Sequence, residues 1–225
     1  EIVTTIHEEL HGGLVDDLVV LDSGSTDDTA QVAADHGARV VRLDEVFPSL
    51  PVMRGKGEAM WRALAATDAD LVVFVDADLR SFTASYITGL LGPLLTDPGI
   101  QLVKAVYERP LVEGDSVVPA GGGRVTELVA RPLLTLYWPQ LAGIIQPLAG
   151  EYAARRSLLS RLPFPVGYGV EFALLVDTAE MFGVDAIAQV DLGGQEMLLE
   201  VLAARQDLAT GPDDVAAAGV ERAFL

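Results

Sequence analysis

Two aspartates separated by one residue, Asp76 and Asp78, are the clearest candidates for chemistry in this sequence. They follow residues 71–75, an apolar run typical of a strand that is covered on both faces. Open parallel sheets bind ligands beyond the carboxyl ends of their strands, where this pair would lie. Carboxylate oxygens suit Mg²⁺ or Mn²⁺, and such an ion would join the pair to a diphosphate. A lone D-x-D motif is common, so the alternative is a solvated turn with a capping aspartate.

Asp22 and Ser23 end an earlier apolar run in the same manner. The carboxylate and hydroxyl groups of residues 22–27 would hold the base or ribose of a nucleotide. The sequence agrees equally well with a simple strand-to-helix turn in which Ser25 or Thr26 caps the helix.

Lysine occurs at only two positions, Lys56 and Lys104, among the 15 basic residues. Nucleotide-composition bias in the genome would explain this scarcity. Lys56 is flanked by Gly55 and Gly57 just before a predicted helix, an arrangement that resembles a phosphate cradle. The spacing is not that of a Walker A loop. We expect Lys56 to meet a phosphate or a carboxylate.

Two later segments also carry residues that could bind a substrate. Residues 121–123 are glycines followed by Arg124 and Thr126, which would hold a second phosphate; a flexible hinge is the alternative. Tyr168 and Glu171 would face a polyhydroxylated substrate, although Glu171 in the first turn of a helix also favours the helix dipole.

The three histidines are expected to be solvated on helix surfaces and not to bind a ligand. They are His7, His11 and His36.

The elements that must position these residues alternate between strand and helix. This alternation predicts an α/β fold with a mainly parallel, Rossmann-like sheet flanked by helices, followed by a helix-rich part. We expect strands at 18–21, 38–43, 71–75, 101–106 and 186–190, helices at 1–10, 25–36, 58–66, 84–95 and 125–136, and a polar loop at 114–119. The predicted parts are a Rossmann-like half (1–108), a second half (109–193) and a C-terminal helical extension (194–225).

Composition excludes several classes of protein. Half of the 225 residues are hydrophobic, which is ample for a core, and the formal charge of −18 disfavours nucleic acids and anionic membranes as partners. The absence of cysteine excludes disulfides and thiolate chemistry and agrees with a cytoplasmic location. No apolar run approaches the roughly 20 residues of a membrane-spanning helix, and residues 1–4 lack signal-peptide character.

Six motifs in order make a more specific signal than any one of them. They are VLDSGSTDDT (20–29), RGKGEAMWR (54–62), VDADL (75–79), GGGRVTELVARPLL (121–134), QPLAGEY (146–152) and PVGYGVE (165–171). Over about residues 14–193 the sequence resembles the glucosyl- and mannosyl-3-phosphoglycerate synthases, retaining glycosyltransferases of the GT-A fold. The resemblance implies transfer of a hexose from a nucleoside diphosphate sugar to the 2-hydroxyl of 3-phosphoglycerate, with Mg²⁺ or Mn²⁺ as cofactor.

The resemblance also implies that residues 1–108 form a nucleotide-sugar-binding half and residues 109–193 an acceptor-binding half, and it implies roles for individual residues. Donor-binding roles fall to Asp22, Ser23, Lys56, Asp76, Ala77, Asp78, Tyr168 and Glu171, and metal binding to Asp76 and Asp78. Acceptor-binding roles fall to Gly123, Arg124, Val125 and Thr126. Catalytic roles fall to Asp78, Glu171 and the backbone carbonyl of Leu148.

The sequence departs from this family at two places. The family opens with a strand that leads to an Asn-Glu pair, whereas residues 1–10 have a helical pattern, and no histidine follows His36, where the family has a metal-binding one. One hypothesis is that separated segments of a longer protein are joined here; a measured mass near 23.8 kDa would contradict it.

Several choices stay open at the level of sequence. Glucose or mannose and UDP or GDP are not distinguished, and dual use is allowed. The apolar residues 133–148 offer a surface for a homodimer. The alternatives to glycosyl transfer are a sugar-phosphate nucleotidyltransferase and a noncatalytic sugar-nucleotide-binding module.

Overall fold

The computed structural model describes residues 1–193, apart from positions 78, 80–81, 108–110, 114–115 and 119–123. The helices are α1 (Ile2–Glu9), α2 (Thr29–Asp35), α3 (Lys56–Ala65), α4 (Ser85–Thr96), α5 (Arg131–Tyr137), α6 (Arg156–Leu159) and α7 (Val170–Phe182). The strands are β1 (Val19–Asp22), β2 (Arg39–Arg42), β3 (Leu71–Phe74), β4 (Leu102–Val106), β5 (Leu111–Glu113), β6 (Ser116–Val118), β7 (Tyr152–Arg155) and β8 (Ile187–Asp191). The helical extension expected over 194–225 lies outside the described residues.

The strands form three sheets, and the expectation of a mainly parallel sheet is wrong. β1 and β2 are parallel, whereas the four-stranded sheet has the order β3-β7-β4-β8, in which β7 runs antiparallel to both of its neighbours. β6, which pairs with β5 in a hairpin, lies within the segment expected to be a polar loop, and β5 directly precedes that segment. β7 escaped prediction because it is short and contains two alanines, which are uncommon in strands and are buried here by tertiary contacts.

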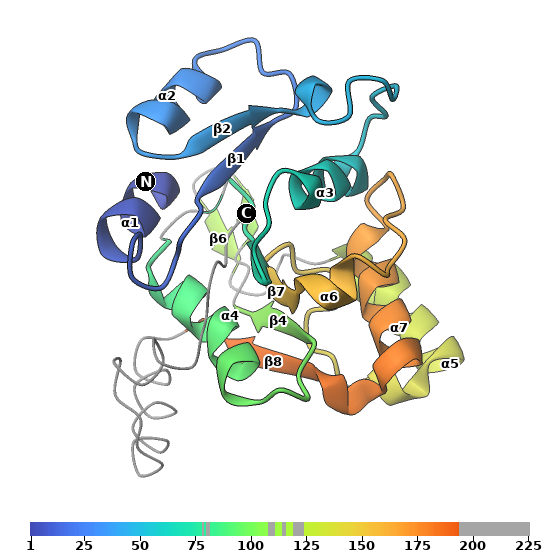
Figure 1. Cartoon of the computed structure of the whole chain (residues 1–225). Coiled ribbons are helices and arrows are strands. Elements are labelled where there is room, and N and C mark those ends of the chain that lie inside the picture. The colour runs from blue at the N-terminus through green and yellow to red at the C-terminus, as the bar shows by residue number, and fades with distance from the viewer. Residues whose placement is uncertain (78, 80–81, 108–110, 114–115, 119–123, 194–225) are drawn as a thin grey trace.

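A cleft lies between the β1–β2 sheet and the four-stranded sheet. Within the described residues no strand pairs with β3 on the side away from β7, or with β1 on the side away from β2. Residues from both of these strands line a cleft of about 860 Å³, which α1, α2 and α3 also border. Figure 1 shows β1, β2 and α2 in one part of the molecule and β4, β7 and β8 in the other. The opening segment forms α1, as its pattern predicts.

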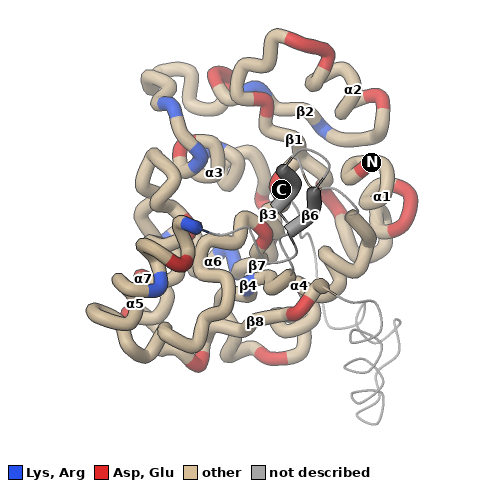
Figure 2. The backbone as a smooth tube through the Cα atoms, turned by 180° about the vertical axis from the view of Figure 1, so that it is seen from behind, with Lys and Arg blue, Asp and Glu red and all other residues tan. Residues whose placement is uncertain are grey.

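Helices cover both faces of the four-stranded sheet. Val72 and Phe74 of β3 pack in a core with residues of α3, α5 and α7, whereas Leu71 and Val73 pack in a second core with residues of α1 and α4. Successive side chains of a strand point to opposite faces, so both faces of β3 are buried, as its unbroken apolar run predicts. In Figures 1 and 2, α5 and α7 lie at the outer edge of the molecule.

The start of α2 differs from the expectation. The helix begins at Thr29 with Asp28 as its N-cap residue, and no side chain caps it. Ser25 and Thr26 do not cap because α2 begins beyond them, at Thr29, while the Ser25 backbone N–H donates to the Asp22 carboxylate in the preceding turn. Gly37, with a φ of 97°, follows the last turn of α2, where a glycine stop is expected.

Candidate functional site

One lysine joins two carboxylates from distant parts of the chain. The Lys56 ammonium lies 2.6 Å from Asp76 Oδ1 and 2.8 Å from Glu171 Oε1. Lys56 begins α3, Asp76 follows β3, and Glu171 lies in the first turn of α7. The carboxylate partner expected for Lys56 is therefore present. Burial lowers the pKa of Lys56, but the hydrogen bonds and charges of the two carboxylates outweigh it, and the pKa is raised above its usual value.

The glycines beside Lys56 serve packing. The Gly57 N–H donates to the Val166 carbonyl at 3.0 Å, and a β-carbon at Gly57 would lie only 1.8 Å from the Pro165 carbonyl oxygen. Gly55 has a φ of 147°, and a β-carbon there would lie 2.1 Å from the Val166 oxygen. The predicted phosphate cradle would use the Gly57 N–H as a donor to phosphate. In the structure this N–H donates to the protein itself, so this part of the prediction is wrong. The close approach brings the segment before α7, and with it Glu171, to Lys56.

A second glycine contact joins residues 146–151 to the same group. A β-carbon at Gly150 would lie 2.0 Å from Asp76 Oδ2 and 2.8 Å from Lys56 Nζ. The half-buried Leu148 lies two residues earlier, and the Ala149 N–H donates to the Gln146 carbonyl at 3.1 Å. The sequence shows a motif at residues 146–152 but predicts no role for Gly150. Its spacing to Asp76 exists only in the folded chain.

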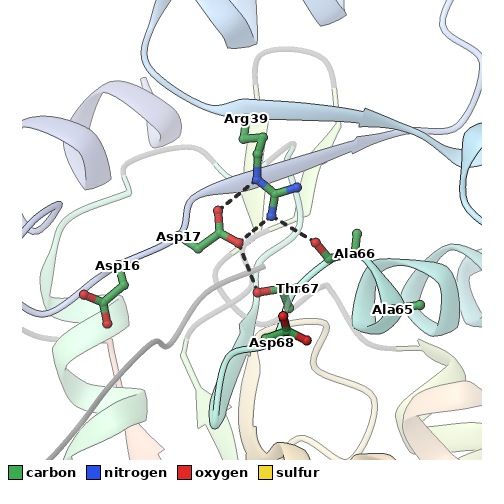
Figure 3. A pocket seen from close by; sticks show the side chains of 7 residues that line it. All are labelled: Asp16, Asp17, Arg39, Ala65, Ala66, Thr67 and Asp68. Carbon is green, nitrogen blue, oxygen red and sulfur yellow. Dashed lines mark hydrogen bonds and ion pairs between the residues drawn. The ribbon is translucent and has the colours of Figure 1, made fainter.

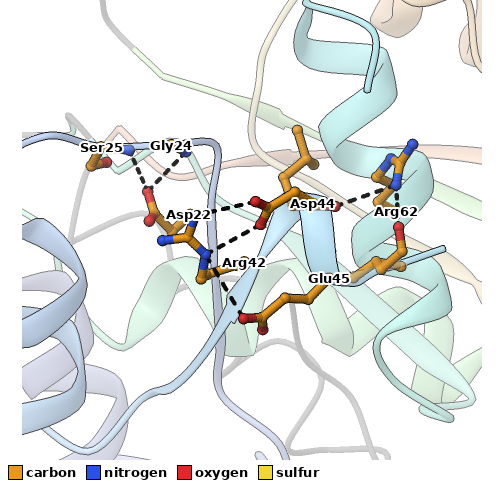
Figure 4. Close-up of polar contacts among 9 residues, drawn as sticks. Asp22, Gly24, Ser25, Arg42, Asp44, Glu45 and Arg62 are labelled. Atoms are coloured by element: carbon orange, nitrogen blue, oxygen red, sulfur yellow. Dashed lines mark hydrogen bonds and ion pairs between the residues drawn. The ribbon is translucent and has the colours of Figure 1, made fainter. Parts of the chain in front are cut away.

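Asp22 is held by its own turn. Its buried carboxylate accepts hydrogen bonds from the backbone N–H groups of Ser25 at 2.8 Å and Gly24 at 3.2 Å (Figure 4). These bonds, led by the one from Ser25, lower the pKa of Asp22 below its usual value. Ser23 is exposed. The structural alternative for this motif, a strand-to-helix turn, is present, although the cap expected from Ser25 or Thr26 is not.

The cleft connects the Lys56 group to the end of β1. Its lining includes Lys56, Asp76 and Ala77 on one side and residues 27–29 at the start of α2 on the other. Apolar side chains such as Leu21 and Met60 line the space between them. Its volume is within the range of about 300–1,000 Å³ typical of small-molecule sites. Lys56, Asp76 and Ala77, expected from the sequence to meet the donor, therefore border one cleft.

A smaller cavity of about 290 Å³ has a structural explanation. Asp17 accepts hydrogen bonds from Arg39 and Thr67, and Arg39 also donates to the Ala66 carbonyl (Figure 3). These contacts fasten β2 to the turn before β3.

The residues present agree with a divalent cation only in part. Asp76 borders the cleft with about a third of its side chain exposed. Asp78 lies outside the described residues, and within those residues no three His, Cys, Asp or Glu side chains gather around a common point. Mg²⁺ commonly needs only one or two carboxylates, because water and substrate phosphates complete its shell. The chemistry of Asp76 therefore fits such an ion bound together with a diphosphate.

The expected acceptor residues form no described hydrogen bond or ion pair with this group. Arg124 and Val125 are exposed, Thr126 is half-buried at the start of a π-helical turn (Thr126–Ala130), and Gly123 lies outside the described residues. Tyr168 is 84% exposed. In the described part of the chain no hydrogen bond or ion pair links Arg124, Thr126 or Tyr168 to Lys56. The three histidines are exposed, as expected.

None of the described helices has the length and apolar character needed to cross a lipid bilayer.

Ligands of α/β proteins commonly bind in a cleft at the ends of the strands, and the following similarities place this chain among the glycosyltransferases. A family model described as glycosyl transferase family 2 matches residues 1–110. The glucosyl-3-phosphoglycerate synthase of Mycobacterium tuberculosis strain H37Rv is 59% identical over 184 residues, which are 80% of this chain and 57% of that protein. This chain thus spans a little over half the length of that curated relative.

Two solved structures from M. tuberculosis extend the match. One glucosyl-3-phosphoglycerate synthase structure is 49% identical with a TM-score of 0.76, over 98% of this chain and 76% of that one. A second, in complex with Mn²⁺, UDP-glucose and phosphoglyceric acid, is 48% identical with a TM-score of 0.76, over 96% of this chain and 72% of that one. The chain belongs to the glucosyl-3-phosphoglycerate synthase family.

Proposed function

We propose that this chain transfers glucose from UDP-glucose to the 2-hydroxyl of 3-phosphoglycerate with retention of configuration. The observation that carries the proposal is the Lys56–Asp76–Glu171 group, held against Gly150 at the edge of a cleft of about 860 Å³. The relative crystallised with UDP-glucose and phosphoglyceric acid supports glucose and UDP over mannose and GDP.

The reaction breaks the bond between the sugar and the diphosphate, so negative charge develops on the leaving group. Asp76, together with Asp78, would hold a Mg²⁺ or Mn²⁺ ion, which when bound stabilises that charge. Lys56 adds a fixed positive charge at the same end of the cleft and holds Asp76 in place. Groups that are held in position before the reaction need little reorganisation as the charge develops.

The sugar carbon becomes oxocarbenium-like as the bond breaks. We expect the carboxylate of Glu171 to contact the transferred sugar. Because Glu171 is 6% exposed and fixed by Lys56, this carboxylate has little freedom to move. We expect the carbonyl of Leu148 to lie beside the reacting centre. The acceptor hydroxyl attacks from the face that the diphosphate leaves and passes its proton to the leaving phosphate, so the configuration is retained.

We expect the phosphate of the acceptor to bind at the start of the π-helical turn. Arg124 is exposed, and its guanidinium suits bidentate binding of the acceptor phosphate, with Val125 and Thr126 following it in the chain.

We further infer that two copies of the chain associate through the exposed apolar face around α5. Leu128, Leu136 and Tyr137 are 75%, 71% and 63% exposed. Clustered apolar side chains of this size usually mark an interaction surface.

The proposal is tested with the Asp76→Asn variant. Loss of the charged ligand is expected to weaken Mn²⁺-dependent UDP binding and to reduce product formation from UDP-glucose and 3-phosphoglycerate, each by about 100-fold. Asp70→Asn is the matched control because the exposed Asp70 precedes the same strand, β3, at its opposite end. Calorimetric titration and product analysis give the two readouts.

Each competing function has its own result in this experiment. Pyrophosphate release from UTP and glucose 1-phosphate would identify a nucleotidyltransferase. Donor binding without product, with metal and acceptor supplied, would identify a noncatalytic binding module. If Asp76→Asn binds UDP with unchanged affinity, Asp76 is not part of the donor site.

A further inference from the structure

The second lysine of the chain is buried in the centre of the larger sheet. Lys104 lies on β4 and is 2% exposed, between the fully buried Val103 and Ala105. Its Nζ donates to the Ala149 carbonyl at 2.6 Å and lies 4.8 Å from the centre of the Tyr152 ring. Removing an ammonium group from water costs several kcal/mol, which bonds of this kind must offset. An apolar residue would fill this strand position at lower cost, so packing alone does not explain a lysine here.

The contacts of Lys104 belong to a set that fastens residues 146–151 to the end of β4. Gln146 exchanges two hydrogen bonds with the backbone of Tyr107. The Ala105 N–H donates to the Glu151 carbonyl at 3.1 Å, and the Tyr107 hydroxyl donates to the Glu151 carboxylate. Both ends of the segment are thus hydrogen-bonded to β4 or to Tyr107 directly after it, and Lys104 bonds to Ala149 between these ends.

This anchoring determines the direction of one carbonyl. The Ala149 N–H donates to the Gln146 carbonyl, so the peptide plane between Leu148 and Ala149 has a defined orientation. In a trans peptide the carbonyl points opposite to the N–H, so the Leu148 oxygen is directed away from Gln146. The next peptide plane is held by the bond from Lys104 to the Ala149 oxygen, and Gly150 follows against Asp76.

We propose that Lys104 is a positioning residue for glycosyl transfer, which orients the Leu148 carbonyl and the Gly150 backbone against Asp76 by holding the Ala149 carbonyl. The proposal rests on the function proposed above, since that function places the Leu148 carbonyl at the reacting centre. Lys104 lies in β4 and is 2% exposed, so we expect it to act through its bond to the Ala149 carbonyl and not through contact with a substrate. Its contribution is therefore to the geometry of the transition state more than to donor binding.

The test compares Lys104→Met with wild type, because methionine keeps the length of the side chain and removes the donor. We expect kcat to fall at least tenfold while KM for UDP-glucose changes less than twofold. Amide hydrogen exchange at Ala149 and Ala105 is expected to accelerate at least tenfold, whereas exchange at Val72 in β3 stays as in wild type. Tyr107→Phe is the matched control, because it removes a hydrogen bond to the same segment and leaves the bond to the Ala149 carbonyl.

The outcomes separate this proposal from the proposed function. Unchanged kcat and unchanged exchange at Ala149 in Lys104→Met would overturn it, and so would equal acceleration at all amides, which indicates a purely structural role. A Tyr107→Phe variant with the same loss of kcat would also overturn it. If wild type forms no product, the proposed function fails. The exchange measurement is independent of that outcome: unchanged exchange at Ala149 in Lys104→Met still rejects the positioning role. If Lys104→Met does not fold, Lys104→Arg restores a charged donor and is expected to keep kcat within threefold.

Discussion

One ammonium group organises the charged residues of the cleft. Lys56 binds Asp76 and Glu171, and the fully buried Tyr152 lies close beneath them. Burial raises the pKa of Tyr152 well above its usual value, and the charges of Glu171 and Asp76 add to this effect. Tyr152 is therefore neutral at any physiological pH. Its hydroxyl reaches the sulfur of Met60 at 3.5 Å, so it completes the core beneath the site without entering the charged group.

The lowered pKa of Asp22 predicts a dependence of stability on acid. A carboxylate with a depressed pKa in the folded state stabilises the protein fully above its unfolded value of 3.8. This contribution is lost as the pH falls through the lower folded value. We expect Asp22→Ala to reduce the free energy of unfolding by about 1 kcal/mol at pH 7.

The difference between wild type and Asp22→Ala is expected to shrink below pH 3.8, as the carboxylate of wild type becomes protonated. Urea unfolding from pH 7 to pH 3 measures it, with Asp70→Asn as an exposed control. If this difference in unfolding free energy stays constant over the range, the charge of Asp22 does not account for the stabilisation.

At the scale of elements, the site exists where backbone segments approach without a β-carbon between them. Gly57 lets the segment at 165–167 lie against the first turn of α3, and Gly150 lets residues 146–151 lie against the end of β3. These two contacts bring α3, β3 and α7 to one place. A side chain at either glycine would separate elements that carry the charged group.

Gly150→Ala tests this account. Its β-carbon would lie 2.0 Å from Asp76 Oδ2, so the carboxylate must move away from Lys56. We expect an unfolding free energy lower by about 1–3 kcal/mol. Mn²⁺-dependent UDP binding is expected to be about 10–100-fold weaker.

Gly143→Ala is the matched control, since a β-carbon there meets no atom within 4 Å. Thermal unfolding and calorimetric titration give both quantities. Wild-type affinity in Gly150→Ala would show that the position of Asp76 tolerates the added methyl group.

The whole molecule combines a strongly acidic composition with a localised apolar surface. The net charge of −18 opposes association through most of the surface, and Figure 2 shows acidic residues on many different elements. The apolar face around α5 is the surface at which we propose that a second copy binds. α5 lies at the outer edge of the molecule, so the face is accessible to a partner.

We expect the double variant Leu128→Lys with Leu136→Lys to dissociate a dimer of the wild type, with an affinity at least tenfold weaker. Both side chains are mostly exposed, so the stability of one chain should change by less than about 0.5 kcal/mol. Sedimentation velocity over a range of concentrations measures the association, with Leu50→Lys as the control for an added charge elsewhere. A monomeric wild type would contradict the proposed dimer.

Much of the first half of the fold was predictable because its signals are local. The apolar run of β3 and the glycine stop after α2 depend on residues near each other in the sequence, and both were confirmed. Lys56 and Asp76 were identified by their place before a helix and after a strand, and Lys56 has the carboxylate partner that was expected. The mixed sheet was missed because the pairing of β7 with β3 joins residues about eighty positions apart.

The sequence by itself determined which segments become strands and helices in the first half, and which residue types stand at their ends, because hydrophobic periodicity and glycine conformation act within a few residues. Only the tertiary structure decided that Lys56 binds Glu171 as well as Asp76, that Gly150 lies against that pair, and that the buried Lys104 holds the Ala149 carbonyl. These contacts join β3, β4, α3 and α7, and their distances follow from how the helices and sheets pack. No spacing along the chain encodes such a distance.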